Sequence, residues 1–370
     1  MKNAIGNSSV FFLGTFEIMI DSIIVGYGLA GFNIAWQMSQ HQKEFLIISD
    51  PTFKGASTNA AGVCNPTVLK RYTMAWNGID FLNYAKAYYK NIESELDNQF
   101  FYPLPIHRIF YKEVEHNDWI VASQREGLTS FLKPELVRKT TTTLKNKAGY
   151  GIVEGLGKLE INTLLKRYKE TRDPNQFLNE SFDHSALIIS KNSIEYKGII
   201  AKRIIFCEGF GLKQNPWFDY LPLVGSKGEY LIIKAPKLSR NQIIKGSVFI
   251  SPMGKDLFWV GASFSRNDKT NTPTVEGNSW LVEKLNTLLN TPYEIVKHEA
   301  AVRPTVIGRK PLLGVHPLHS NMFILNGLGT RGVLMAPLLS KWLMKYIDEG
   351  KQIPNEVAIN RFESYFSNPK

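Results

Sequence analysis

Three glycines and one carboxylate near the start of the chain have the spacing of a dinucleotide-binding turn. Residues 26–31 read GYGLAG, and Asp50 follows Gly31 by 19 residues. Gly26 permits a tight turn, Gly28 leaves room for a pyrophosphate beside the backbone, and Gly31 lets a helix pack closely on a sheet. Free N–H groups at the helix start can bind phosphate, and the carboxylate can accept ribose hydroxyls. The spacing predicts the adenosine end of a dinucleotide site, either NAD or FAD.

The elements that must position these residues follow in the expected order. Residues 22–25 form an apolar run typical of a buried parallel strand, and residues 45–48 form another. A helical pattern lies between them and extends to about Gln40. The complete order of strand, glycine turn, helix, strand and acid favours a ligand site over a plain glycine-rich turn.

The composition is that of a globular protein with a basic surface. Of 370 residues, 44% are hydrophobic and 21% are charged, and 44 Lys and Arg exceed 33 Asp and Glu to give a net charge of +11. The charge attracts anions such as nucleic acid or acidic lipids, but no basic block dominates, which favours a solvated basic surface. No run approaches the roughly 18 to 20 apolar residues of a membrane span, so no stable membrane insertion is expected.

The cysteines and histidines indicate neither a disulfide framework nor a metal site. Cys64 and Cys207 are the only cysteines and are far apart, which fits a reducing cytoplasm. His316 and His319 are expected in a polar loop, because no further ligands accompany them. Residues 1–18 precede the first strand and are expected to be an unstructured, dispensable leader, with a short transit or membrane-contact segment as the alternative.

The rest of the chain predicts an α/β fold with two parts. Residues 55–72 are rich in small residues and without periodicity, so they can lie close to a large flat ligand. From residue 225, alternating patterns joined by turns indicate an antiparallel sheet. We therefore expect a Rossmann-like nucleotide-binding domain with a parallel sheet and an inserted α+β substrate domain with an antiparallel sheet. The expected boundaries are 19–90, 145–222 and 298–370 for the first domain, and 91–144 and 223–297 for the second.

Four separated stretches resemble the D-amino-acid-oxidase-like family of FAD-dependent oxidoreductases, which includes glycine and sarcosine oxidases. They are GYGLAG with Asp50, ASTNAAGVCNP, IIFCEGFG, and AVRPTVIGRKPLLG followed by NGLGTRGVLMAP. The last stretch, in this form, resembles the oxidoreductase half of the bifunctional tRNA wobble-uridine enzyme, whose methyltransferase half is absent here. The chain departs from the family pattern at Asp50, where glutamate is more usual, and at Glu208, where the family typically has threonine.

The resemblance implies FAD, bound non-covalently because neither cysteine lies in the C-terminal part where covalent relatives carry theirs. The Rossmann turn, the small-residue segment and the late glycine turn would hold it. The cofactor-binding residues expected on this basis are Gly26, Gly28, Leu29, Ala30, Gly31, Asp50, Ser57, Thr58, Ala61, Gly62, Gly209, Gly329, Thr330, Gly332, Val333 and Leu334.

No second dinucleotide fingerprint is found, so the substrate itself is expected to reduce the flavin, with oxygen or another acceptor reoxidising it. The resemblance implies oxidation of a C–N bond in a small amino acid or secondary amine. It implies that Arg303 grips the substrate carboxylate, for which a planar guanidinium is suited. Arg331 is a weaker candidate, and Lys227 is expected to be structural. A structural ion pair is the alternative for Arg303.

Two other functions remain open from the sequence. The GLGTRG form and the net charge of +11 favour a flavoenzyme that acts on a modified tRNA base, which would make tRNA a partner. A flavin-binding protein without turnover is the third reading, because no catalytic base is identifiable.

Overall fold

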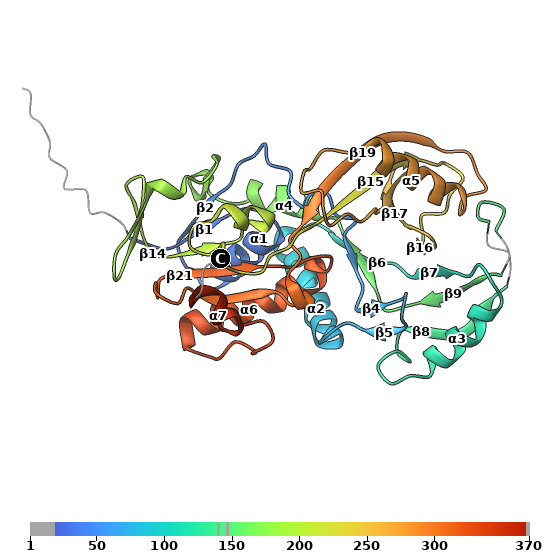
Figure 1. Ribbon diagram of the computed structural model, residues 1–370, viewed down its shortest axis with the longest axis horizontal. Helices are drawn as coiled ribbons and strands as arrows, with labels where there is room; N and C mark the ends of the chain where they lie inside the picture. The colour runs from blue at the N-terminus through green and yellow to red at the C-terminus, as the bar shows by residue number, and fades with distance from the viewer. Residues whose placement is uncertain (1–18, 139–140, 146–147, 368–370) are drawn as a thin grey trace, which may run out of the picture.

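The computed structural model describes residues 19–138, 141–145 and 148–367, and the expected leader, residues 1–18, lies outside them. The described chain forms two halves side by side, each built on one large sheet (Figure 1). The helices and strands of the first half surround the predicted dinucleotide-binding turn, and those of the second half begin with the segment after α2 (Gly78–Leu96).

The first sheet has a parallel centre, as its apolar strands predict. β1 pairs in parallel with β2 on one side and with β14 on the other, and β14 pairs in parallel with β21. Residues of β2 and β21 are buried throughout, which is the pattern of strands covered on both faces. The strands of this sheet are β1 (Ile20–Val25), β2 (Phe45–Ile48), β11 (Phe177–Leu178), β12 (Leu187–Ile189), β13 (Ile194–Tyr196), β14 (Ile199–Phe206), β20 (Leu312–Val315) and β21 (Met322–Asn326).

Three helices pack together on one face of this sheet. α1 (Leu29–Gln40) packs against α6 (Gly332–Glu349), and α6 packs against α2. The Tyr89 hydroxyl donates a hydrogen bond of 2.8 Å to the carbonyl of Val333, which ties α2 to the first turn of α6. α6 ends at Gly350, where the glycine adopts a φ of +66°. The N-termini of α1 and α6 therefore lie in one packed unit.

The second sheet is antiparallel except where β16 pairs in parallel with β7. α5 (Val275–Asn286) packs on β15 and β18, and α3 (Val114–Ser123) packs on β8 (Figure 1). β9 lies in this sheet although we expected residues 145–222 in the nucleotide-binding part, so the proposed domain boundaries and the sheets divide the chain differently. In sheet order the strands are β19 (Glu294–Arg303), β15 (Ser226–Lys234), β18 (Leu257–Gly261), β17 (Phe249–Gly254), β16 (Ile243–Lys245), β7 (Ile106–Ile109), β9 (Tyr150–Val153) and β8 (Leu132–Val137).

Short elements connect the two halves. A three-stranded sheet holds part of the small-residue segment against the segments that follow α2 and precede α4 (Ile161–Glu170). The remaining elements are β3 (Val63–Cys64), β10 (Gly157–Leu159) and β6 (Phe101–Pro103) in that sheet, the pair β4 (Thr67–Val68) and β5 (Thr73–Met74), the 3-10 turns η1 (Pro174–Gln176), η2 (His184–Ala186), η3 (Gly209–Gln214), η4 (Ile307–Arg309) and η5 (Ile359–Phe362), and α7 (Glu363–Ser367).

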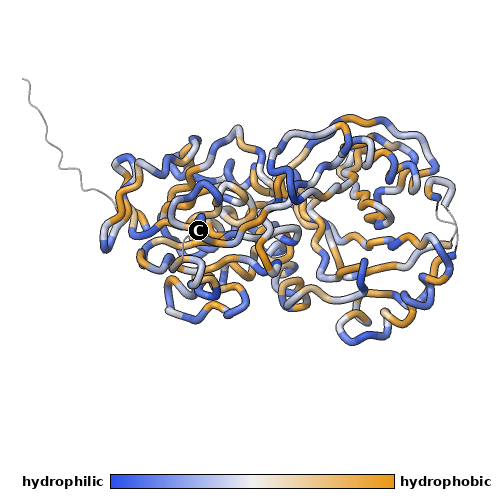
Figure 2. Tube along the Cα trace, in the orientation of Figure 1, coloured by the Kyte–Doolittle hydropathy of each residue, from blue (hydrophilic) through white to orange (hydrophobic). Residues whose placement is uncertain are grey.

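The apolar core follows this division into layers. One buried cluster lies between the first sheet and helices α1, α2 and α6, and it continues to β7 and α3 in the other half. A second cluster covers the opposite face of the first sheet, and a third lies between the second sheet and α5. Figure 2 shows hydrophobic segments along the strands of both halves and hydrophilic segments at the outer loops. The first cluster thus joins the two halves through buried apolar contacts.

Candidate active site

A cavity of about 810 Å³ is lined by residues of both halves. Its size is within the usual range of small-molecule and cofactor sites. Most residues predicted from the sequence line it, whereas Gly31, Asp50 and Leu334 lie outside its lining. The predicted residues that line it are Gly26, Gly28, Leu29, Ala30, Ser57, Thr58, Ala61, Gly62, Gly209, Arg303, Gly329, Thr330, Arg331, Gly332 and Val333.

The glycine turn between β1 and α1 has the close contacts that its sequence predicts. Gly26 has a φ of +98°, and a Cβ there would lie 2.6 Å from the carbonyl oxygen of Cys207. A Cβ on Gly31 would lie 1.9 Å from the carbonyl oxygen of Gly26, and one on Gly28 would lie 2.9 Å from the hydroxyl of Ser57. Each glycine is therefore required by its backbone or by its surroundings.

Backbone donors at the start of α1 are available to an anion. The Leu29 N–H donates to the Ser57 hydroxyl over 3.0 Å, and Gly28 caps the helix without a side-chain hydrogen bond. Within the described residues, the N–H groups of Ala30 and Gly31 have no hydrogen-bond acceptor. Free N–H groups, the positive helix end and the space that a Cβ would fill fit the pyrophosphate of a dinucleotide.

Asp50 follows β2 and lies next in sequence to Ser49, which lines the cavity. Its Oδ1 accepts hydrogen bonds from the backbone and hydroxyl of Thr52, and its Oδ2 accepts one of 2.6 Å from the Ser181 hydroxyl. The hydrogen bonds from Ser181 and Thr52 lower the pKa of Asp50 to about 2, so the group is a carboxylate. Ser49, which we did not predict, lines the cavity instead. Asp50 as the ribose ligand stays a prediction.

The small-residue segment is attached to the second sheet by Asn59, a residue that sequence reasoning missed. The buried Asn59 side chain donates to the carbonyl of Gly55 over 2.8 Å and accepts from the Tyr230 hydroxyl over 2.6 Å. The Trp259 indole donates to the Asn59 carbonyl over 3.1 Å. Strand alternation could have placed Tyr230 and Trp259 on one face, but only the fold brings Asn59 to them.

Glu208 is the only acidic residue among the described residues that line the cavity. It follows β14, where the resemblance leads us to expect threonine. Its carboxylate is paired with the His184 ring at 2.9 Å and accepts a hydrogen bond of 2.8 Å from the Asn215 amide. Both carboxylate oxygens of Glu208 therefore have partners. The other charged side chains of the cavity lining are cationic.

The late glycine turn connects β21 to α6 beside the first turn. Gly327 and Gly329 have φ values of +73° and +55°, which favour glycine. A Cβ on Gly332 would lie 3.0 Å from the Leu29 side chain, so α6 begins next to the start of α1. Two helix N-termini therefore point their positive ends toward one cavity.

Arg303 ends β19 and lies against the backbone of β15. A Cβ on Gly228 would lie 1.9 Å from its guanidinium, so the glycine makes room for the arginine. The guanidinium donates to the Lys227 carbonyl over 3.4 Å, and no carboxylate of the described residues is within 4.0 Å of it. Burial lowers the pKa of Arg303 from its ordinary value. A structural ion pair, which is the alternative role for Arg303, would thus lack its carboxylate in the part of the chain that is described.

Arg331 caps α6 and also lines the cavity. Burial lowers its pKa, and the charge of nearby Arg309 lowers it further. Neither of the two predicted arginines is paired with a carboxylate among the residues described. These two arginines therefore present positive charge to an anionic ligand in the cavity.

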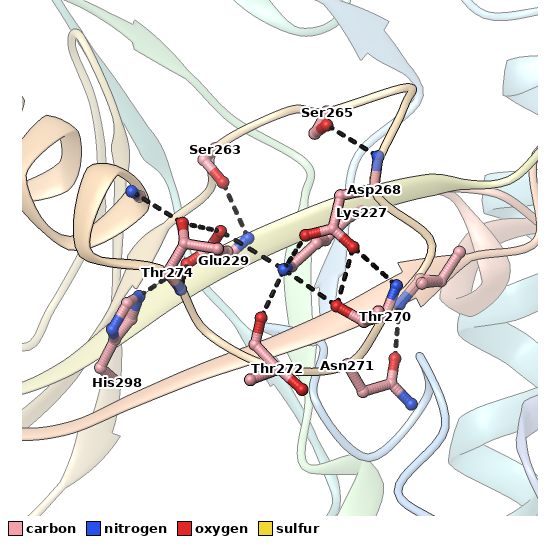
Figure 3. Close-up of polar contacts among 12 residues, drawn as sticks. Lys227, Glu229, Ser263, Ser265, Asp268, Thr270, Asn271, Thr272, Thr274 and His298 are labelled. Carbon is pink, nitrogen blue, oxygen red and sulfur yellow. Dashed lines mark hydrogen bonds and ion pairs between the residues drawn. The ribbon is translucent and has the colours of Figure 1, made fainter.

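The loop from residue 262 to 274 forms one wall of the cavity and is anchored to β15 (Figure 3). Lys227, whose exposed fraction is 1%, donates to the Asp268 carboxylate and to the Thr272 carbonyl. Glu229 accepts hydrogen bonds of 2.8 Å from the backbone and from the hydroxyl of Thr274, and the His298 ring lies 3.0 Å from it. These contacts fix the wall that presents Lys269 and Asn271 to the cavity.

Two further searches of the described residues concern metals and membranes. No group of three or more metal-ligating side chains is found in the described part of the chain. Among the described helices, none has the length and apolarity needed to cross a bilayer.

The family model for "FAD dependent oxidoreductase" matches residues 21–346. The glycine oxidase of Bacillus subtilis (strain 168) is 22% identical over 338 residues, which are 86% of this chain and 90% of that protein. The tRNA 5-methylaminomethyl-2-thiouridine biosynthesis bifunctional protein MnmC of Azoarcus sp. (strain BH72) is 24% identical over 173 residues, which are 41% of this chain but 27% of that protein. The crystal structure of glycine oxidase from Geobacillus kaustophilus has a similar fold, with a TM-score of 0.76 at 18% identity over 93% of this chain and 98% of that one.

Proposed function

Because this chain belongs to the family of FAD-dependent oxidoreductases, we propose that it oxidises a C–N bond in an amino acid or secondary amine that carries a carboxylate. The enzyme class and the cofactor, FAD, follow from the family. The proposal adds the class of substrate to this family assignment. It rests on the cationic cavity and on the similarity to a glycine oxidase.

Arg303 is the observation that carries the proposal. Its guanidinium lines the cavity, is desolvated by its surroundings, and has no carboxylate partner among the described residues. A partly buried charge without a partner is unfavourable, so an anion that binds there gains strong charge-assisted hydrogen bonds. A substrate carboxylate would complete this pair, and the rest of the substrate would then lie in the same cavity as the cofactor.

When bound, FAD supplies the acceptor for a hydride from the carbon next to nitrogen. The nitrogen lone pair then forms a C=N bond, and water splits the resulting iminium into an amine and a carbonyl compound. The protein holds the substrate so that the C–H bond is aligned, which supplies much of the rate without a dedicated base. Gly228 leaves the room in which the guanidinium of Arg303 lies, and Lys227 anchors the loop that forms a wall of the cavity. The positive ends of α1 and α6 stabilise negative charge.

We also propose that FAD is bound without a covalent link. Cys64 and Cys207 are both buried, and burial raises the pKa of the Cys64 thiol to about 12 and raises that of Cys207 as well. A neutral thiol is a poor nucleophile. Acid precipitation should release all FAD into the supernatant, and flavin that stays with the protein would contradict this part of the proposal. A cytoplasmic location and reoxidation by oxygen or another acceptor also stay proposals.

A second candidate is oxidation of a modified tRNA base. The similarity to MnmC, the GLGTRG turn and the net charge of +11 support it. Contacts to several phosphates would make the affinity for tRNA fall steeply with salt. Retention of bulk tRNA at low salt and release at high salt would favour this candidate, whereas the absence of retention at low salt would remove it.

Turnover with an artificial electron acceptor tests the main proposal. The holoenzyme is incubated with glycine, N-methylglycine and longer N-substituted glycines, and the amine and oxoacid products are measured. The expected result is equal amounts of the two products from at least one of these carboxylates, and no turnover of the corresponding amine that lacks the carboxylate. Equal turnover of the amine without a carboxylate would contradict the role of Arg303.

A further inference from the structure

A row of paired residues crosses the second sheet on the face that borders the cavity. Tyr230 pairs with Gly261, Gly261 with Phe249, and Phe249 with Lys245. Residues directly opposite each other in a sheet project from the same face. All four line the cavity, so the row is part of its floor. Lys245 ends the floor on the side away from β19, where Arg303 lies.

Lys245 has no carboxylate partner in the described part of the chain. Its Nζ donates to the Gly246 carbonyl over 2.9 Å and lies 4.6 Å from the centre of the Phe249 ring. No Asp or Glu of the described residues is within 4.0 Å of it. Burial lowers the pKa of Lys245 to about 8, and the charges of Arg108 and Lys70 contribute to the change.

The neighbours of Lys245 increase the positive charge. Arg108 pairs with Lys245 across β7 and β16, and its ion pair with Glu115 has a long distance of 3.7 Å. Lys70 also lines the cavity and is exposed, without an ion pair among the residues described. Like charges held together are unfavourable unless an anion joins them. Lys70 alone could be an ordinary solvated lysine of the protein surface. That explanation does not apply to Lys245, which is partly buried on the floor of the cavity.

The two cationic ends of the floor are separated by an apolar stretch. The Arg303 guanidinium lies over Gly228 on β15, and the Lys245 ammonium lies near Phe249 on β17. One strand, β18, lies between β15 and β17, and two strand spacings are about 10 Å, to which the offset of Gly228 by two residues along β15 from Tyr230 adds. Tyr230 and Phe249 line the cavity between them, with Gly261 leaving space.

We propose that Lys245 and Lys70, reinforced by the nearby charge of Arg108, form a second anion subsite, and that the substrate is an amine with a carboxylate at one end and a further anionic group at the other. This inference rests on the proposed function, because it assumes that Arg303 holds the first carboxylate. A carboxylate or a phosphate would suit the second subsite, since lysine binds either as a point charge. The chain between the two groups would cross the apolar floor.

Binding of unreactive acids to the holoenzyme tests the second subsite separately from turnover. Heptanoate and heptanedioate differ only in the second carboxylate, and 6-phosphonohexanoate replaces that group by a phosphonate. Their Kd values are measured by calorimetry and by the shift in flavin absorbance. We expect each dianion to bind at least about tenfold more tightly than heptanoate, as one charged hydrogen bond allows. The tighter of the two dianions identifies the preferred second group.

Lys245→Met should remove most of this preference and leave the Kd of heptanoate unchanged. Lys237→Met, which removes one exposed charge from the turn after β15, is the matched control and should keep the preference. Equal binding of all three acids to the wild type, or an equal loss for all three in Lys245→Met, would overturn the second subsite alone. Failure of every acid to bind would contradict the carboxylate role of Arg303 as well.

Discussion

Replacing Arg303 by methionine should weaken carboxylate binding while FAD stays bound. The guanidinium can offer two charge-assisted hydrogen bonds to one carboxylate, and each contributes about 1.5 to 3 kcal/mol. The loss of about 3 kcal/mol or more corresponds to a rise in Kd of about 100-fold or more. The backbone donors of α1 and α6 are untouched, so the flavin content should equal that of the wild type.

A second variant keeps the charge of Arg303 and tests whether the position of its guanidinium matters. Gly228→Ala keeps Arg303 but adds a Cβ that would lie 1.9 Å from its guanidinium, which must therefore move. We expect weaker carboxylate binding with the FAD content unchanged.

The assay for both variants is a titration of the holoenzyme with a carboxylate, followed by flavin absorbance and by the ratio of flavin to protein. Arg240→Met is the control, since Arg240 is exposed and its pair with Asp256 has a distance of 3.7 Å. Loss of flavin from Arg303→Met, or a Kd within about threefold of the wild type, would refute the reasoning from charge-assisted hydrogen bonds.

Three further predictions concern the cofactor, the cavity wall and pH. Gly28→Leu should abolish FAD binding, because a side chain would fill the space beside Ser57; a yellow, saturated protein would be the contrary result. Lys227→Met should lower the free energy of unfolding by about 3 kcal/mol, as loss of one partner of a buried ion pair does; denaturant unfolding measures this, and a change under about 0.5 kcal/mol would argue against the anchor. Protonated Lys245 binds an anion and its pKa is about 8, so affinity for heptanedioate should fall as pH rises above 8 while affinity for heptanoate changes less; parallel pH profiles would contradict this.

The first βαβ unit could be predicted closely because its signals are local. Residues 45–48 were expected as a strand and form β2, and the first helix ends at Gln40 as expected. The tight turn at Gly26 leaves no room for a side chain, because residues near in sequence or after the adjacent strand lie close to it. The spacing of the glycines in the sequence reflects this lack of room. Local pattern was sufficient here.

Contacts between distant segments were beyond the sequence pattern. Asn59 accepts from Tyr230, 171 residues later, and only the packing of the two halves brings them together. The parallel pairing of β16 with β7 is similar, because no turn connects these strands and nothing in either strand specifies its partner. The charge cluster of Lys245 and Arg108 depends on that pairing and was therefore not predicted. Arg303 was found because its motif is family-specific, not because its burial is visible in the sequence.

Anaerobic reduction of the bound flavin tests the central proposal most directly. The holoenzyme is mixed without oxygen with glycine, N-methylglycine, longer N-substituted glycines that carry a second anionic group, and bulk tRNA in a separate arm. If a carboxylated amine reduces the flavin, at least one of these amines should abolish the oxidised flavin absorbance. One amine molecule should be consumed for each flavin reduced. An oxidised spectrum with every amine would contradict it, and bleaching by tRNA alone would support the second candidate instead.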